Sequence, residues 1–257
     1  MAFFNTGNPW KDRALAAGAH LGTSLAVAAV AAAVVFFVWY PYPYREISGG
    51  RELFFLVVAV DVVLGPLLTF TIFSHKKPWK SLQRDLGMIA ALQLAALVYG
   101  LWTVAVARPV HLVFEYDRFR PIHALEVDAS QLEKAPLAMR SLSWTGPTAI
   151  GMRPLVGNEK MDATMLALNG VHLGLQTQYW KPYEASRADV LKVGRPLAEL
   201  RQRFAKEAGL IDQAVGSAGK PEAQLLWLPM VGRKDFWTVL VDAQTAQPLA
   251  FLPLDSF

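Results

Sequence analysis

Three long apolar runs dominate the first half of the chain. They cover Leu15–Tyr40, Leu53–Phe73 and Leu86–Ala107. An α-helix needs about 20 apolar residues to cross the hydrocarbon of a bilayer, and each run has that length. The uncharged core of the first run, Leu21–Val38, is too long for a signal peptide. The pattern therefore predicts a domain of three transmembrane helices over residues 1–107.

From residue 108 onward the pattern changes to short alternating segments. β-Branched and aromatic residues predict strands, while Asn or Pro at a helix start and Gly after its end predict two helices. The predicted strands are Val110–Tyr116, Ile122–Val127, Leu225–Val231, Phe236–Asp242 and Pro248–Leu252, and the predicted helices run from Asn158 to Leu168 and from Pro196 to Ala208. A turn is expected over Asp117–Pro121. The sequence predicts an α+β domain over residues 108–257 with a small antiparallel sheet, the last three strands forming a meander, and leaves the strand order open.

Composition supports a membrane protein. Hydrophobic residues make up 53% of the chain and charged residues 18%, whereas soluble domains average about 25% charged residues. The C-terminal domain is nearly neutral, so the basic excess lies beside the apolar runs and favours contact with the lipid bilayer over nucleic acid. There is no cysteine, which excludes disulfides, thiolate metal sites and cysteine nucleophiles.

The basic residues predict an orientation. Lys11 and Arg13 precede the first run, and four basic residues with a single acidic one lie between residues 76 and 85. Because cytoplasmic loops carry the excess of Lys and Arg, the N-terminus and this loop are expected in the cytoplasm. Three spans then place the C-terminal domain in the periplasm of a bacterium, with the helices in the inner membrane. The alternative is a cytoplasmic C-terminal domain, with one run forming a hairpin or a buried helix.

Asp61 lies near the middle of the second run. A carboxyl group at that depth is costly and needs a partner or a function. By residue count Tyr99 lies at a similar depth and is the expected partner, with Gln93 about one turn or more deeper. Three interpretations remain open: a structural hydrogen bond, a contact with another membrane helix, or proton transfer.

Gly65 and Pro66 follow Asp61 by one turn. Proline removes a backbone hydrogen bond, and glycine lets a neighbouring helix approach closely. Thr69 and Thr71 are expected to satisfy the freed carbonyl groups. This is either an ordinary kink or a groove for a client helix. Gly18 and Gly22 add a weaker small-residue face to the first run.

Nothing in the sequence indicates an enzyme. The five histidines have no metal-binding spacing, and phosphate-binding or nucleophile motifs are absent. Glu115 and Asp117 are expected on one face of a strand, beside Arg118 and Arg120, which favours an ion-paired surface over an acid–base pair. We expect no catalytic residue, no cofactor and no metal.

Several strings together resemble one protein family. These are Val38–Pro41, Gly49–Phe54, Val60–Thr69, Ala91–Thr103, Ala107–Val110, Val113–Glu115, Asp117–Phe119, Leu240–Ala243 and Leu252–Leu254. They resemble the TfpX/TfpZ-type type IV pilin accessory proteins. The resemblance covers most of the chain and is densest over residues 38–120, whereas residues 130–220 add little.

The resemblance implies a non-catalytic inner-membrane chaperone that helps its cognate type IV major pilin to reach or enter the pilus. Before assembly such a pilin is a membrane helix with a periplasmic head, so a helper needs surface in both places. The residues that become candidates for this contact are Asp61, Gly65, Pro66, Gln93, Tyr99, Arg108, Glu115, Asp117 and Arg118. The alternative is a membrane sensor whose periplasmic domain binds a ligand.

Overall fold

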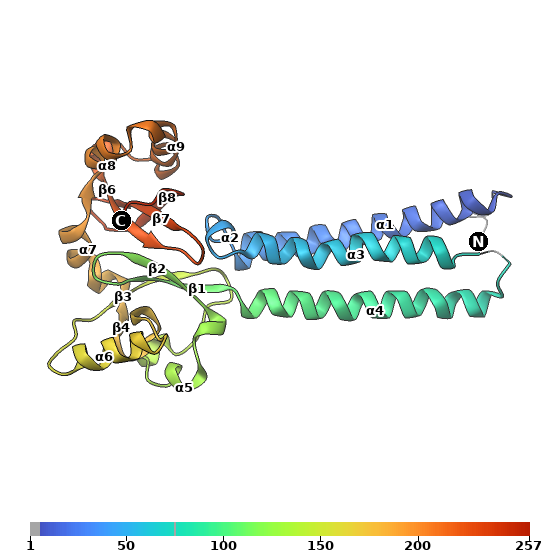
Figure 1. Ribbon diagram of the computed structural model, residues 1–257, viewed down its shortest axis with the longest axis horizontal. Coiled ribbons are helices and arrows are strands. Elements are labelled where there is room, and N and C mark those ends of the chain that lie inside the picture. The colour runs from blue at the N-terminus through green and yellow to red at the C-terminus, as the bar shows by residue number, and fades with distance from the viewer. Residues whose placement is uncertain (1–5, 75) are drawn as a thin grey trace. The chain divides into compact units, whose positions relative to one another are not determined.

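The computed structural model describes residues 6–74 and 76–257 and divides into two compact units (Figure 1). The helical unit contains the chain up to Arg45 together with Gly49–Ala107. The sheet unit contains Arg108–Phe257 and, in addition, the short segment Glu46–Ser48.

Three helices in the helical unit are long and apolar enough to cross a membrane, as the sequence predicts. Their bounds are α1 Pro9–Ala33, continued by a π-helical turn over Val34–Trp39; α3 Gly50–Ile72; and α4 Trp79–Val106. A short helix, α2, covers Tyr44–Ile47. The helices begin earlier than the apolar runs, since helical hydrogen bonding continues into polar residues. The Asn8 side chain, for example, accepts hydrogen bonds from the backbone of Trp10 and Lys11 and caps α1.

Helix α3 holds the helical unit together, because α1 and α4 both pack along it. At Gly100 of α4 a Cβ atom would lie 2.5 Å from Cγ1 of Val57, so glycine is what permits this close approach of α3 and α4. A buried cluster around Val35, Tyr40 and Phe54 closes one end of the unit. Within it the Tyr40 hydroxyl donates a 3.0 Å hydrogen bond to the Val104 carbonyl oxygen.

The sheet unit is built on a mixed sheet, so the prediction of a small antiparallel sheet is wrong. The strand order is β4-β3-β1-β2-β6-β7-β8, with β5 paired to β6. The strands are β1 Pro109–Phe114, β2 Phe119–His123, β3 Thr148–Met152, β4 Trp180–Pro182, β5 Arg195–Pro196, β6 Leu225–Val231, β7 Phe236–Asp242 and β8 Pro248–Leu252. The predicted meander β6–β7–β8 is present and antiparallel.

The sequence did not indicate that some strands of this sheet pair in parallel. Strand β3 runs parallel to β1, and β2 runs parallel to β6 through the single pair Phe119–Met230. Strands β1 and β2 form an antiparallel hairpin, but β2 begins at Phe119, three residues before its predicted start. Pro121 therefore lies within the strand rather than in a turn.

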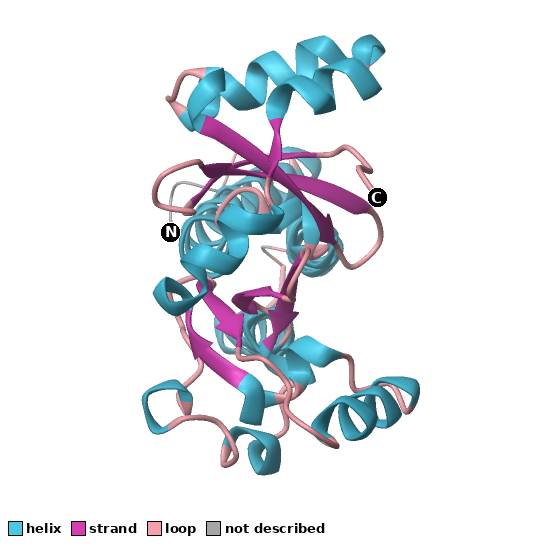
Figure 2. Ribbon diagram, turned by 90° about the vertical axis from the view of Figure 1, so that its left-hand side faces the viewer, coloured by secondary structure: helices cyan, strands magenta, loops and turns pink. Residues whose placement is uncertain are grey.

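Helices lie at two ends of this sheet, α8 and α9 at one and α5 and α6 at the other (Figure 2). They are α5 Ala129–Leu132, α6 Glu159–Leu168, α7 Arg187–Val193, α8 Leu197–Arg203 and α9 Ala208–Ala218, and short 3-10 turns join them. Helix α6 is confirmed. The predicted start of a helix at Pro196 is confirmed, since α8 begins at Leu197. Its predicted end at Ala208 is wrong, because the chain leaves helical geometry at Phe204 and Gly209 lies inside α9.

Two hydrophobic cores stabilise the sheet unit. One surrounds Trp180 and includes β1 and β3 residues, and the other surrounds Trp227 and includes α8, α9 and the meander. Both indoles are almost fully buried and donate to carbonyl oxygens, Trp180 to Gly174 at 2.8 Å and Trp227 to Pro196 at 3.1 Å. Burying aromatic surface of this kind supplies much of the driving force for folding.

Candidate functional site

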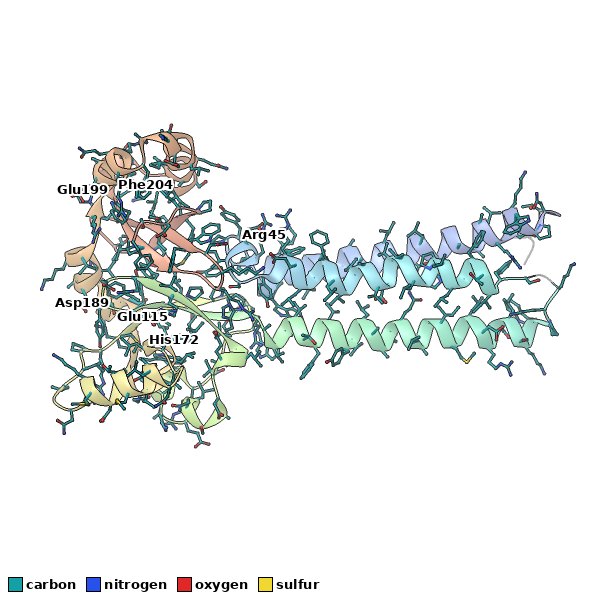
Figure 3. The ribbon with its side chains drawn as sticks, viewed as in Figure 1. Arg45, Glu115, His172, Asp189, Glu199 and Phe204 are labelled. Carbon is teal, nitrogen blue, oxygen red and sulfur yellow. The ribbon has the colours of Figure 1, made fainter. Side chains whose placement is uncertain are left out.

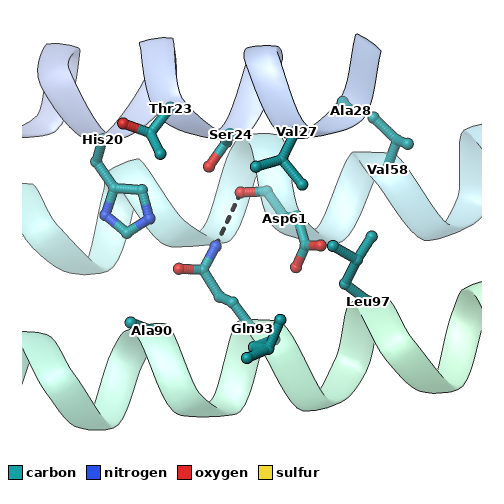
Figure 4. A pocket seen from close by; sticks show the side chains of 11 residues that line it. His20, Thr23, Ser24, Val27, Ala28, Val58, Asp61, Ala90, Gln93 and Leu97 are labelled. Carbon is teal, nitrogen blue, oxygen red and sulfur yellow. Dashed lines mark hydrogen bonds between the residues drawn. The ribbon is translucent and has the colours of Figure 1, made fainter. Parts of the chain in front are cut away.

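A groove runs between α1 and α4, with α3 as its floor. One part of it, of about 170 Å³, is lined by residues of all three helices, among them Ser24 and Ala28 of α1, Asp61 of α3, and Gln93 and Leu97 of α4 (Figure 4). A second part of about 420 Å³ shares Val27 and Leu97 and continues between α1 and α4. The walls are mainly apolar, and the polar groups are concentrated around Asp61.

Gln93 joins α4 to α3 at this point. Its amide nitrogen Nε2 donates a 3.0 Å hydrogen bond to the backbone carbonyl oxygen of Asp61 (Figure 4). Gly65 makes room for this, since a Cβ atom there would lie 2.1 Å from Gln93 Nε2. The sequence candidates Asp61, Gly65 and Gln93 are thus brought together.

Two oxygen atoms in the groove have no donor. Among the described residues, none donates a hydrogen bond to Asp61 Oδ1 or to Gln93 Oε1, and both atoms are buried. Exchanging the ends of the Gln93 amide would lose the hydrogen bond that Nε2 donates to the Asp61 carbonyl. The groove therefore contains two acceptors that this chain leaves unused.

The prediction that Tyr99 is the partner of Asp61 is wrong. Tyr99 is 68% exposed, and its ring lies 6.0 Å from the Trp102 ring. Tyr99 points away from the groove because it lies six residues beyond Gln93, which at 100° per residue is a different face of α4. Pro66 is half-buried inside an unbroken α3.

The two threonines of α3 do not have their expected roles. Pro66 frees the carbonyl of Val62, but the Thr71 hydroxyl donates instead to the Leu67 carbonyl at 2.9 Å. The Thr69 hydroxyl lies 2.6 Å from Nδ1 of His20, so this pair links α1 to α3. The sequence did not indicate this pair, because tertiary packing brings the two helices together at this point.

Arg108 and the exposed pair Asp117–Arg118 make their contacts inside the sheet unit. Arg108 is buried, donates from Nε to the Ser143 carbonyl at 2.9 Å, and lies 3.7 Å above the Trp144 ring. Arg118 makes two hydrogen bonds, of 2.7 and 3.0 Å, with the exposed carboxylate of Asp117. The predicted ion-paired surface is present here, whereas contact of these residues with a partner stays a prediction.

The prediction that Glu115 and Asp117 lie on one face of a strand is wrong. Tyr116 between them has a φ of +62°, which breaks the alternation of the strand and turns Glu115 inward. Its carboxylate accepts hydrogen bonds from the Gly174 backbone at 2.7 Å and from Arg120 Nε at 3.0 and 3.2 Å. His172 Nδ1 lies 3.6 Å from Oε1 of this carboxylate. Figure 3 labels Glu115 and His172 in the sheet unit. Burial alone would raise the pKa of Glu115, but His172 and Arg120 hold that pKa below its usual value.

Two other histidines of the sheet unit each contact a polar side chain. His123 Nδ1 lies 2.8 Å from the Glu126 carboxylate, and His111 Nδ1 lies 2.8 Å from the Thr148 hydroxyl. Burial lowers the pKa of His111 to about 4. His75 lies outside the described residues. Within residues 6–74 and 76–257, no group of His, Asp and Glu side chains is arranged to hold a metal ion.

Comparison with known proteins identifies relatives along most of the chain. The family "Fimbrial assembly protein FimB" matches residues 8–49. The fimbrial assembly protein of serogroup I from Dichelobacter nodosus is 32% identical over 228 residues, which is 88% of this chain and 89% of that protein. The serogroup E1 protein of the same organism is 31% identical, also over 88% of this chain and 89% of that protein. The protein of serogroups C1 and C2 is 42% identical over 46% of this chain and 90% of its own length.

No solved structure is significantly similar to this chain. The relatives carry the fimbrial assembly name, which agrees with the broader part of the sequence resemblance, while the finer TfpX/TfpZ assignment stays a prediction. The identity stays above 30% over nearly nine tenths of both chains. The chain therefore belongs to the family of fimbrial assembly proteins.

Proposed function

We propose that this protein is a membrane-embedded accessory protein of type IV fimbrial assembly that acts as a chaperone for the fimbrial subunit, without catalysis. Relatives named as fimbrial assembly proteins over 88% of the chain support the process. Three helices of membrane-spanning length and composition support the membrane location.

The proposed topology places the N-terminus in the cytoplasm and the sheet unit in the periplasm, with the three helices in the bacterial inner membrane. The Lys and Arg residues at the start of α1, in the loop between α3 and α4 and at the start of α4 support this orientation. A periplasmic reporter enzyme fused after Phe257 is expected to be active, and a reporter that works only in the cytoplasm is expected to be inactive. The reverse pattern would overturn the topology.

The groove between α1 and α4 is the observation that carries the chaperone function. A fimbrial subunit awaiting assembly has an apolar helix in the same bilayer, and a groove that opens between two helices offers that helix a binding surface. Helices associate in lipid through close packing and interhelical hydrogen bonds. The groove supplies small and apolar walls with Asp61 and Gln93 at its floor.

Crosslinking in the membrane tests this function. Photo-reactive residues would replace Val27 and Leu94, which line the groove and are 44% and 62% exposed. Leu92 is the matched control, because it is 68% exposed on α4 but does not line the groove. Two residues along a helix correspond to a rotation of about 200°, so Leu92 and Leu94 point in nearly opposite directions.

We expect the fimbrial subunit to be captured from Val27 and Leu94 and not from Leu92. Equal capture from Leu92 and Leu94 would show that the groove has no special role. Absence of the subunit from all three positions, with normal amounts of both proteins in the membrane, would overturn the proposed contact.

A further inference from the structure

The chemistry of the groove restricts what can occupy it. Asp61 Oδ1 and Gln93 Oε1 are buried acceptors, and no described residue donates to either. Two of the nearby donors bond to backbone carbonyl groups instead: Gln93 Nε2 donates to the Asp61 carbonyl, and the Thr23 hydroxyl donates to the Ala19 carbonyl. In this structure neither acceptor receives a hydrogen bond from the described residues, so a donor on an occupant of the groove would satisfy both.

Lipid tails cannot supply these donors. Hydrocarbon offers no hydrogen-bonding group, so a carboxyl and an amide oxygen facing lipid would stay unsatisfied at a considerable cost. An apolar side chain at either position would avoid that cost. The presence of both acceptors at one place favours an occupant that carries a donor at the same depth.

The shape of the groove fits a helix. Its lining residues extend along α1 from His20 to Val34, which at 1.5 Å per residue is about 20 Å, or nearly four helical turns. Small side chains lie along the walls, including Ala28 of α1 and Ala90 of α4. Small residues let a second helix backbone approach closely, and interhelical hydrogen bonds then fix its register.

We infer that the groove binds an apolar membrane helix that presents a hydrogen-bond donor, such as a hydroxyl, amide or ammonium group, to Asp61 Oδ1 and Gln93 Oε1. The identity of that helix as the fimbrial subunit rests on the proposed function. The donor sets the depth and rotation of the bound helix, while the apolar and small walls of the groove contact the rest of it.

The test uses the full chain in its native membrane, with the photo-reactive residue at Leu94. Capture is compared among the wild type, Asp61→Asn and Asp61→Leu, and each yield is divided by the amount of protein in the membrane. Asparagine keeps an acceptor oxygen, so we expect its yield to stay within about twofold of the wild type. Leucine removes the acceptor, and we expect at least about a fivefold fall. Asp61→Ala, which adds no volume, replaces the leucine variant if that variant fails to accumulate.

The outcomes separate this inference from the proposed function. Undiminished capture of the fimbrial subunit in Asp61→Leu and Asp61→Ala would overturn the donor contact and leave the function standing. Capture of a different membrane helix, with the same dependence on Asp61, would support the donor contact and overturn the function. Crosslinks to lipid alone in the wild type would overturn both.

Discussion

Two carboxyl groups, those of Glu115 and Asp61, show how differently the two units treat polar groups. In the sheet unit Glu115 accepts hydrogen bonds from Gly174 and Arg120 and faces His172. In the helical unit the Oδ1 atom of Asp61 is buried and receives no hydrogen bond from the described residues. The sheet unit thus satisfies its carboxylate internally, whereas the helical unit leaves an acceptor available in a groove.

This difference separates stability from binding. A buried charge with all its partners present becomes costly when one partner is removed, because the others are left unpaired. A buried acceptor without partners contributes nothing to the fold that holds it, so its removal is tolerated. Glu115 is therefore expected to matter for folding and Asp61 for association.

The largest effect is expected for Glu115→Leu. The change leaves the Gly174 N–H and the Arg120 guanidinium without their acceptor. We expect the sheet unit to lose about 3 kcal/mol of unfolding free energy. Hydrogen exchange of β1 amides in the purified full chain measures this loss.

The matched control for that measurement is Asp61→Leu, with exchange followed in α3. We expect a change below about 1 kcal/mol, in either direction. A loss as large as that of Glu115→Leu would show that Asp61 has an essential structural partner, and it would remove the distinction between the two carboxyl groups.

A pH dependence of the sheet unit is expected to come next in size. Burial holds the pKa of His111 at about 4, below the ordinary value of 6.5 that applies in the unfolded chain. The unfolded state therefore binds more protons between these values, so stability is complete above about pH 6.5 and falls as the pH decreases toward 4. From pH 7.5 to pH 5 the loss is about 2 kcal/mol.

The variant that tests this origin is His111→Phe, which keeps an aromatic ring beside Trp180, at present 5.0 Å from the His111 ring. Its stability, followed by hydrogen exchange of β3 amides, should change far less between pH 7.5 and pH 5. The lowered pKa of Glu115 acts in the same direction, but only as the pH falls below its unfolded value near 4.5. A variant that loses stability as steeply as the wild type would show that His111 is not the source.

A smaller effect is expected for Gly65→Ala in the helical unit. The added Cβ atom would displace the Gln93 amide and break its hydrogen bond to the Asp61 carbonyl. We expect a loss of about 1 kcal/mol, measured by thermal unfolding in detergent and followed by helical circular dichroism. Gly22→Ala is the control, since a Cβ atom there has nothing within 4 Å. Equal destabilisation by both variants would argue against the Gly65–Gln93 contact.

The smallest effect is expected for Asp117→Asn. The Asp117–Arg118 pair is exposed on the surface of the sheet unit, and exposed pairs contribute little because water screens them. We expect a change of no more than about 0.5 kcal/mol in the exchange of β2 amides. A loss comparable to that of Glu115→Leu would contradict the assignment of Glu115 to the core and of Asp117 to the surface.

Local pattern predicted several parts of this fold correctly. Continuous apolar runs give long helices whatever their neighbours, because each backbone hydrogen bond is made within the helix. The meander β6–β7–β8 and helix α6 also follow from alternation, turn residues and helix-ending signals within short segments. The Asp117–Arg118 pair needs only adjacency in the chain.

Contacts between distant segments were beyond that pattern. Strand β3 is short, contains Gly151, and becomes a strand by pairing in parallel with β1, more than 30 residues earlier. The inward turn of Glu115 depends on a positive φ at Tyr116 and on Gly174, which donates to it across the unit. Parallel pairing and buried ion pairs of this kind are made by tertiary packing, which the spacing of residues does not reveal.

The same limit applies to the candidate site. The sequence by itself identified Asp61, Gly65 and Gln93, because a carboxyl group, a small residue and an amide are unusual within apolar runs. It selected Tyr99 as the partner of Asp61, since residue count gives depth along a helix. Only the tertiary structure decided which face of α4 packs against α3, and that rotation places Gln93 in the groove and leaves Tyr99 outside it.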